Sequence, residues 1–276
     1  MNARAHLGRL AAGLAATLLL AACAGSSSPT AGPSAPTMTP PASAPSPAAA
    51  EPWDLVFFSD SSLGDVPDRW AARIRERLGI EVRVHTWPEG PGSTPRDLLQ
   101  ALEDRADVRD AIAGAELIGI ETVPVGTEPA DVLAETCVPA DPTPRDPPPV
   151  YSVADLTEYA GQLRSIFDRI FELRAGKPTI VRAMDMYTPV LDQWTAAGVE
   201  PECTAGWEAH AGTIRLVADE YGVTTASIYG LFNGPGHHED PVDKGYIGED
   251  GVHPNEAGTA AQVDFLDSLG YEPVQR

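Results

Sequence analysis

The chain has 276 residues, 43% of them hydrophobic, with 40 acidic against 19 basic side chains and a formal net charge of −21. A protein this acidic is repelled by nucleic-acid phosphates and by anionic lipid head groups, so we exclude nucleic acid as a partner. The length is sufficient for one domain with a sizeable hydrophobic core.

The first 22 residues have the pattern of a secretory signal peptide. Arg4 and Arg9 precede or open an uncharged, apolar run over residues 10–22, which is shorter than the about 20 residues that cross a bilayer. The run ends in Leu20-Ala21-Ala22-Cys23, which resembles the lipobox of bacterial lipoproteins. That resemblance implies lipidation of Cys23 and an exported protein that is anchored to the cell membrane. The alternative is an ordinary signal peptide with a chance cysteine.

Residues 23–50 are predicted to form a tether. Residues 24–50 contain seven prolines among Ala, Ser, Thr and Gly, and neither a charged nor an aromatic side chain. Such a segment has too little to bury to offset the entropy of ordering, so we expect it to be extended and solvated. Loss of the two signal-peptide arginines takes the net charge from −21 to −23. We expect the folded domain to span residues 51–276.

Within this domain, strand and helix patterns alternate. Short apolar runs predict strands at residues 53–58, 80–86, 115–123, 179–184 and 223–228, and periodic apolar positions or caps predict helices at residues 65–78, from 94, 153–173, 205–221 and 254–269. This alternation is typical of a parallel sheet covered by helices on both faces, here a three-layer α/β/α sandwich with five strands. Ligands bind such sheets at the carboxyl ends of the strands.

Several polar segments fall at that edge. Ser59 to Gly64 follow the first strand, Gly90 to Ser93 follow the second, and a long loop after the fifth strand leads to Asp250 and His253. A carboxylate three residues before a histidine can bond Nδ1–H and leave Nε2 free as a base. Taken alone, this pair is more often a polar turn before a helix.

Together these segments resemble the sequence blocks of the SGNH (GDSL-type) hydrolases. Ser59-Asp60-Ser61-Ser62-Leu63 is similar to the first block, Gly92-Ser93-Thr94 to the second, and the run from Asp250 to Gly258 to the fifth. The resemblance implies a flavodoxin-like fold and a serine hydrolase of carboxylic esters, such as a lipase, esterase or carbohydrate O-deacetylase. It implies no cofactor and no metal, and we expect a monomer.

The same resemblance assigns a role to each site residue. Ser61 is the implied nucleophile, His253 its base, and Asp250 the carboxylate that orients His253, while the N–H groups of Ser61 and Gly92 receive the oxyanion. Ser62 is the alternative nucleophile.

The third block of the family, which supplies an oxyanion asparagine, is not matched. The third strand leads into Ile120-Glu121-Thr122-Val123-Pro124, where no asparagine occurs, and a Glu121 carboxylate would oppose an oxyanion. Loss of one such donor costs about 10²–10³ in rate. The alternative function is therefore a binding module that has kept the fold with weakened catalysis.

An even pair of cysteines, Cys137 and Cys203, remains in the predicted domain. In an exported protein such a pair favours a disulfide, the alternative being two buried thiols.

Four further features have a functional and an ordinary interpretation. His237-His238-Glu239-Asp240 could bind a metal or form a solvated loop, and Asp185 could line the site or start a helix. The segment 127–149 could be a lid or a stiff surface excursion. Three tryptophans could wall an acyl or sugar site or belong to the core: Trp87, Trp194 and Trp207.

Overall fold

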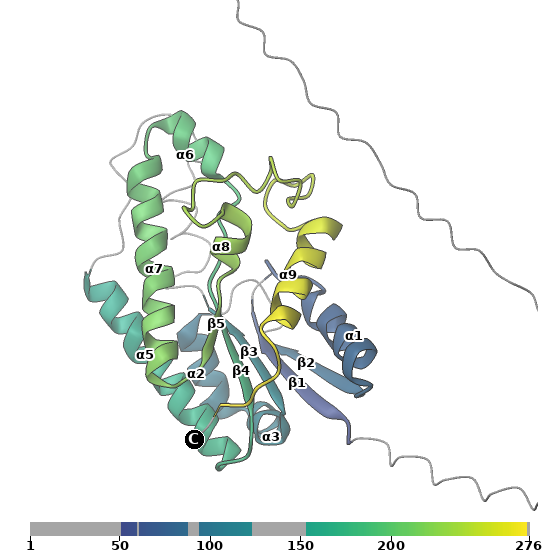
Figure 1. The fold of residues 1–276 in the computed structure, drawn as a ribbon. Helices are drawn as coiled ribbons and strands as arrows, with labels where there is room; N and C mark the ends of the chain where they lie inside the picture. The colour runs from purple at the N-terminus through teal and green to yellow at the C-terminus, as the bar shows by residue number, and fades with distance from the viewer. Residues whose placement is uncertain (1–50, 60, 88–93, 123–152, 275–276) are drawn as a thin grey trace, which may run out of the picture. The chain divides into compact units, whose positions relative to one another are not determined.

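A computed structural model describes residues 51–59, 61–87, 94–122 and 153–274. Five parallel strands form one sheet in the order β2-β1-β3-β4-β5, with helices on both faces (Figure 1). The strands are β1 (Trp53–Phe58), β2 (Val82–Trp87), β3 (Leu117–Glu121), β4 (Ile180–Met184) and β5 (Thr224–Ala226). The predicted three-layer α/β/α fold with a five-stranded parallel sheet is thereby confirmed.

The described helices include all five that were predicted and three that were not. The predicted ones are α1 (Val66–Leu78), α2 (Pro95–Asp104), α5 (Val153–Arg174), α7 (Glu200–Glu220) and α9 (Glu256–Ser268). The additional ones are α3 (Ala106–Gly114), α6 (Leu191–Ala197) and α8 (Ile228–Asn233). These three are too short to show several turns of apolar periodicity, so their sequence signal is weak.

Two predicted boundaries differ for identifiable reasons. The fifth strand ends at Ala226 because Ser227 caps α8, accepting a hydrogen bond from Gly230 N–H. The last helix starts at Glu256 because Asn255 caps it, whereas Pro254 pairs in an isolated bridge with Ile247. The predicted capping box at Thr94 is present, with Thr94 and Asp97 each accepting from the other's backbone N–H.

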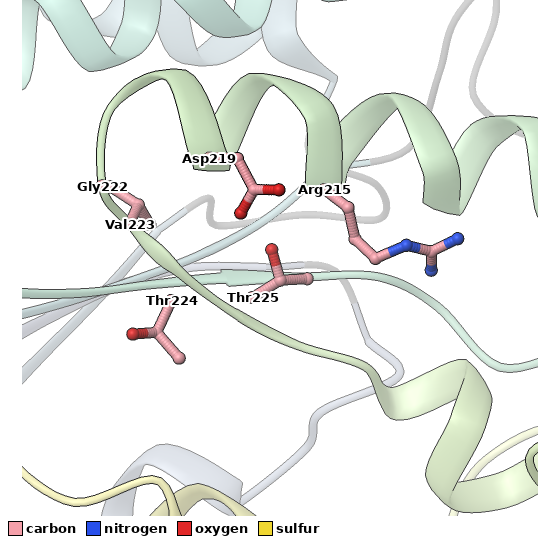
Figure 2. A pocket seen from close by; sticks show the side chains of 6 residues that line it. All are labelled: Arg215, Asp219, Gly222, Val223, Thr224 and Thr225. Atoms are coloured by element: carbon pink, nitrogen blue, oxygen red, sulfur yellow. The ribbon is translucent and has the colours of Figure 1, made fainter.

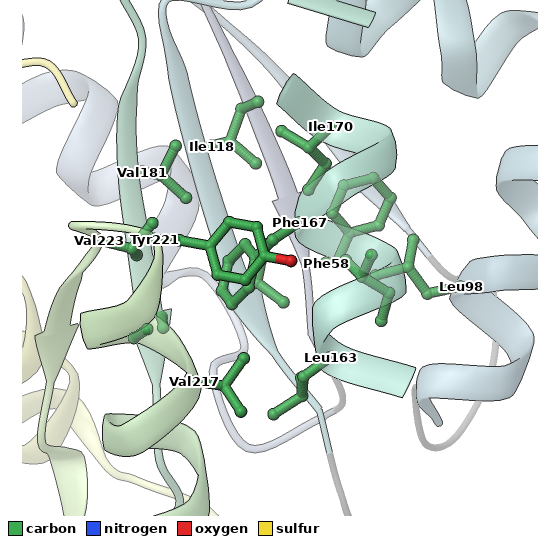
Figure 3. Packing of buried hydrophobic residues seen from close by; sticks show 14 of the residues in the cluster. Phe58, Leu98, Ile118, Leu163, Phe167, Ile170, Val181, Val217, Tyr221 and Val223 are labelled. Atoms are coloured by element: carbon green, nitrogen blue, oxygen red, sulfur yellow. The ribbon is translucent and has the colours of Figure 1, made fainter. Parts of the chain in front are cut away.

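Alternate residues of β1, an interior strand, contribute to a hydrophobic core on each face of the sheet. Val56 and Phe58 of β1 face the core beneath α2, α3, α5 and α7, part of which Figure 3 shows. Leu55 and Phe57 face the core beneath α1, α8 and α9. All four side chains are at most 1% exposed, as an interior strand of a sheet covered on both faces requires. This second core holds α1, which follows the loop after β1, and α9, which follows the loop that contains Asp250 and His253.

No helix within the described ranges is both long enough and apolar enough to cross a membrane.

Candidate active site

The loop before α9 holds His253 in a compact turn. Asp250 Oδ1 accepts the backbone N–H groups of both Val252 and His253, at 2.9 Å each, and Gly251 adopts a φ of 74° that favours glycine. The backbone of His253 is fixed further because its carbonyl accepts the Gly248 N–H at 2.8 Å. The Tyr187 hydroxyl donates to the Val252 carbonyl at 2.7 Å, which ties the turn to the segment after β4.

Ser61 lies in the turn between β1 and α1. The turn is anchored on both sides, because the Leu63 side chain is 1% exposed and the Leu63 carbonyl accepts the Val66 N–H at 2.9 Å. Gly64 follows with a φ of 47°, a backbone conformation that residues with a Cβ seldom adopt. Ser61 itself is exposed. The sequence therefore folds here into a firm turn that presents a serine to solvent.

The structure brings Ser61, His253 and Asp250 together. His253 Nε2 lies 3.0 Å from Ser61 Oγ, and His253 Nδ1 lies 2.7 Å from Asp250 Oδ2. Hydrogen bonds from the N–H groups of Val252 and His253 are the largest causes that lower the pKa of Asp250 to about 2. Asp250 is thus an ionised acceptor, so Nδ1 carries the imidazole proton and Nε2 can accept the Ser61 hydroxyl.

Ser62, the alternative nucleophile, lies in a different environment. Its side chain is only 8% exposed, and its hydroxyl donates to the buried carboxylate of Glu121, with Oγ at 3.1 and 3.0 Å from Oε1 and Oε2. Ser61, by contrast, is the serine within hydrogen-bond reach of His253. The geometry therefore favours Ser61 over Ser62 as the group that His253 activates.

An ion-pair ladder joins the helices that follow the two halves of the site. Three arginines of α1, one turn apart, each pair with an acid of α9, and we call these pairs the arginine ladder: Arg69–Glu256 at 2.5 Å, Arg73–Asp264 at 2.6 Å and Arg77–Asp267 at 2.8 Å. Arg69 also bonds Asp65 at 2.7 Å. The Arg69 rung thus links the start of α1, close after Ser61, to the first residue of α9, close after His253.

We expect the rung next to the site to affect activity more than the rung at its far end. Arg69→Gln should lower kcat several-fold for any reaction that uses the contact between Ser61 and His253, because small displacements of a base relative to a nucleophile are costly. Arg77→Gln, the matched change on the same two helices, should leave kcat near the wild-type value. Both pairs are partly exposed, so each change should shift Tm only slightly. Equal kcat values for the two folded variants would contradict this expectation.

The His237-His238-Glu239-Asp240 segment does not form a metal cluster. His237 Nδ1 lies 3.2 Å from Glu208, whereas His238 Nδ1 lies 2.9 Å from Glu200. The His237 ring also stacks on Tyr229, with ring centroids 3.8 Å apart. No group of three potential metal ligands occurs among the described residues. Adjacent histidines here point to separate carboxylates on α7.

Two of the three candidate tryptophans belong to the core. Trp194 is fully buried and packs edge to face on Trp207, with centroids 5.9 Å apart. Trp207 is 8% exposed and its Nε1–H donates to the Met186 carbonyl at 2.7 Å. Trp87, at the end of β2, stacks on Phe58 at 5.8 Å. The ordinary interpretation therefore holds for Trp194 and Trp207.

Asp185 is a helix-start residue, which is one of its two predicted roles. Its fully buried carboxylate accepts the Ser227 hydroxyl and the Tyr229 N–H, each at 2.8 Å, and so holds the first turn of α8. Burial raises the pKa of Asp185 to about 6, against the hydrogen bonds, which lower it. Arg215 Nη1 lies 3.6 Å away.

Arg215 also borders an open pocket of about 440 Å³ between α7 and the edge strand β5 (Figure 2). The pocket is lined by Arg215, Asp219, Gly222, Val223, Thr224 and Thr225. None of the residues that line it belongs to the Ser61, His253 and Asp250 group.

Other predicted site residues lie outside the described ranges. These are Gly92, Cys23 and Cys137, together with the segment 127–149. Cys203 is described, and its side chain is 1% exposed in α7 among Trp194, Trp207 and their neighbours.

Glu121 makes a contact that the sequence did not predict. Its side chain is 1% exposed and its carboxylate accepts the Ser62 hydroxyl. Its position as the first polar residue after the apolar run of β3 was the available signal, because such residues fall at the ligand-binding edge of the sheet.

Comparison with solved structures shows a shared fold. A lipase from a goat rumen metagenome superposes with a TM-score of 0.58 at 18% identity, over 80% of this chain and 98% of that one. Phospholipase A1 from Streptomyces albidoflavus NA297 gives 0.53 at 16% identity, over 79% and 99%. An extracellular lipase from Streptomyces rimosus gives 0.52 at 15% identity, over 78% and 99%. No family sequence model and no curated protein sequence matches the chain.

Proposed function

We propose that this protein is an SGNH-type serine hydrolase that cleaves carboxylic esters. The observation that carries the proposal is the hydrogen-bonded series from Ser61 Oγ through the His253 ring to Asp250, at 3.0 and 2.7 Å. It joins residues almost two hundred positions apart in the order that nucleophilic catalysis requires. The fold shared with two lipases and a phospholipase A1 supports the same conclusion.

The proposed reaction has two halves. Ser61 Oγ attacks the ester carbonyl while His253 Nε2 takes its proton, and the imidazolium formed is stabilised by Asp250. His253 then gives that proton to the leaving alcohol, which leaves an acyl group on Ser61. Water attacks the acyl group with His253 again as base, and the carboxylic acid departs as Ser61 regains its proton. No step requires a cofactor.

The oxyanion of each tetrahedral intermediate needs hydrogen-bond donors. Within the described ranges no acceptor takes the Ser61 N–H, so we propose this group as one donor. We propose the Gly92 N–H as the second, on the strength of the sequence resemblance alone. Without the family's asparagine, the site suits esters better than amides, because an amide needs more stabilisation of the same intermediate.

The direct test is an assay of the purified protein on p-nitrophenyl esters with short and long acyl chains. We expect turnover, with covalent labelling of Ser61 by a fluorophosphonate probe. A folded sample that shows neither turnover nor labelling would favour the second candidate, a non-catalytic binding module of the cell envelope. The unmatched third block is the observation that favours that candidate.

We further propose that the protein is exported and held at the membrane surface by lipid on Cys23. The support is the uncharged run of residues 10–22, the adjoining lipobox-like sequence and the proline-rich segment after it. In this setting the natural substrates are esters of the cell envelope or the surroundings. Incorporation of labelled palmitate should stop in Cys23→Ala, and incorporation that persists would refute the anchor.

A disulfide between Cys137 and Cys203 is proposed on the even cysteine count of an exported domain. A bond between these two cysteines would close the loop formed by residues 137–203, and closing a loop of this length would stabilise the fold by about 4 kcal/mol. We therefore expect Cys137→Ser to lower Tm by several degrees, and wild-type protein under reducing conditions to show the same loss. Alkylation of both thiols in unfolded, unreduced protein would show that they are not bonded.

A further inference from the structure

The end of β3 differs from the family pattern in a way that the fold explains. Glu121 is the last residue of β3 and is 1% exposed, although it lies at the edge of the sheet that carries the site. Burying a carboxyl group is costly unless hydrogen bonds compensate. An anion near a developing oxyanion would also slow the proposed reaction. Glu121 is therefore unfavourable here both for stability and for the proposed reaction, which suggests that its carboxylate has a structural role.

The carboxylate of Glu121 binds the residue next to the nucleophile. Ser62 Oγ donates to Glu121, with 3.1 and 3.0 Å to the two carboxylate oxygens, across 59 positions of sequence. In the sheet, Phe58 of β1 pairs with Ile120 of β3, so Glu121 comes directly after the last paired position of these strands. The bond therefore ties the turn that leaves β1 to the end of its neighbouring strand.

The strand end that makes this bond is itself held firmly. The Tyr159 hydroxyl donates to the Thr122 carbonyl at 3.0 Å, and His210 Nε2 lies 3.1 Å from the same hydroxyl. Tyr159 and His210 are each 2% exposed, and burial lowers the pKa of His210 to about 3, so that its ring stays neutral. Glu121 thus sits on a backbone fixed by buried hydrogen bonds from α5 and α7.

From this arrangement we infer that Glu121 is a positioning residue for Ser61, acting through the hydroxyl of Ser62. The inference rests on the proposed esterase function. Ser62 has little freedom once its hydroxyl is bound, and Ser61 is its covalent neighbour. The bond therefore fixes both the Oγ and the N–H of Ser61 relative to His253. In this chain a buried carboxylate secures the nucleophile turn at the strand end where the family carries an oxyanion donor.

The test removes each partner in the full-length protein. Glu121→Ala and Ser62→Ala should each lower kcat for p-nitrophenyl acetate by about 10- to 100-fold, with KM changed little, since misplacement of a nucleophile affects the chemical step. The double variant should lose little more than the worse single variant, because both changes remove one interaction. Glu121→Gln and Ser62→Thr retain a hydrogen bond and should recover most of the rate.

A matched control removes a hydroxyl–carboxylate bond at the opposite edge of the sheet. The Tyr271 hydroxyl donates to Asp267 at 2.7 Å, and the Tyr271 ring packs on Trp53, the first residue of β1. Tyr271→Phe should keep kcat near wild type. Near-UV circular dichroism and Tm establish that each variant is folded. Ser62→Ala removes the same bond with a smaller change, so it keeps the test valid if Glu121→Ala does not fold.

The possible results distinguish failure of the positioning role of Glu121 from failure of the proposed esterase function. An active wild type whose folded Glu121→Ala and Ser62→Ala variants keep wild-type kcat and wild-type rates of fluorophosphonate labelling would overturn the positioning role alone. Additive losses in the double variant would overturn it too. A wild type that neither turns over esters nor reacts with the probe would overturn the proposed function, and the positioning role with it.

Discussion

Ser61→Ala should abolish ester hydrolysis. The Ser61 hydroxyl is the proposed nucleophile and lies 3.0 Å from His253 Nε2, and alanine provides no oxygen to acylate. In a serine hydrolase whose three residues act as a unit, loss of the serine costs about 10⁶ in kcat. We expect a loss of that order, measured as initial rates on p-nitrophenyl acetate, together with complete loss of fluorophosphonate labelling.

A second serine supplies the control for this prediction. Ser268 lies at the end of α9 and its hydroxyl donates to the Phe265 carbonyl at 2.7 Å, away from the site. Ser268→Ala should retain wild-type rates and labelling. Labelling that persists in Ser61→Ala would assign the nucleophile elsewhere, and Ser62 would be the first residue to examine.

Asp250→Asn should lower kcat by as much as about 10⁴ while leaving the loop intact. An asparagine at this position keeps the oxygen that accepts the N–H groups of Val252 and His253. It replaces the oxygen 2.7 Å from His253 Nδ1 with an NH₂ group, which can only donate. Nδ1 would then have to accept, so the proton would move to Nε2 and the ring could no longer take the proton of Ser61.

The same loop contains a second aspartate that accepts a backbone N–H group but does not contact His253. Asp240 Oδ1 accepts the Val242 N–H at 2.8 Å in a similar turn, so Asp240→Asn makes the same chemical change away from the site. We expect it to preserve kcat. An Asp250→Asn enzyme with wild-type kcat would show that the tautomer of His253 is fixed by other groups, and would remove Asp250 from the mechanism.

The low pKa of Asp250 also fixes how pH should act on activity. Because its folded-state pKa is about 2, against 3.8 for a free aspartate, Asp250 favours the fold above pH 3.8 and loses that contribution as the pH falls towards 2. Asp250 therefore remains charged through the range in which imidazoles titrate. A pH–rate profile should accordingly show no loss from protonation of Asp250 above about pH 4.

Much of the fold follows from local sequence. The apolar run of β1 was predicted with its observed bounds, and the long stripe of α5 was predicted to within one residue of its end. Thr94 and Asp97 lie three residues apart, so their reciprocal bonds form within one helical turn. The short helices α3, α6 and α8 were not predicted, because elements of this length are decided by the surfaces against which they pack.

The candidate site divides in the same way. Asp250 and His253 interact across three residues, and the sequence alone therefore determined that half of the site together with the turn that holds it. The contact between His253 and Ser61 joins positions 192 apart, and only the pairing of parallel strands brings the two loops to one edge. The sequence resemblance supplied Ser61 as a candidate, and the tertiary structure separated it from Ser62.

Glu121 shows most plainly what the sequence could not decide. A glutamate after an apolar strand is compatible with a solvent-exposed charge, a metal ligand or a repulsive group beside an oxyanion. Its burial and its bond to Ser62 depend on the register between β1 and β3, in which Phe58 pairs with Ile120. Local patterns determine which residues form strands, helices and turns, whereas partners distant in sequence are chosen by packing, since that choice depends on the whole sheet.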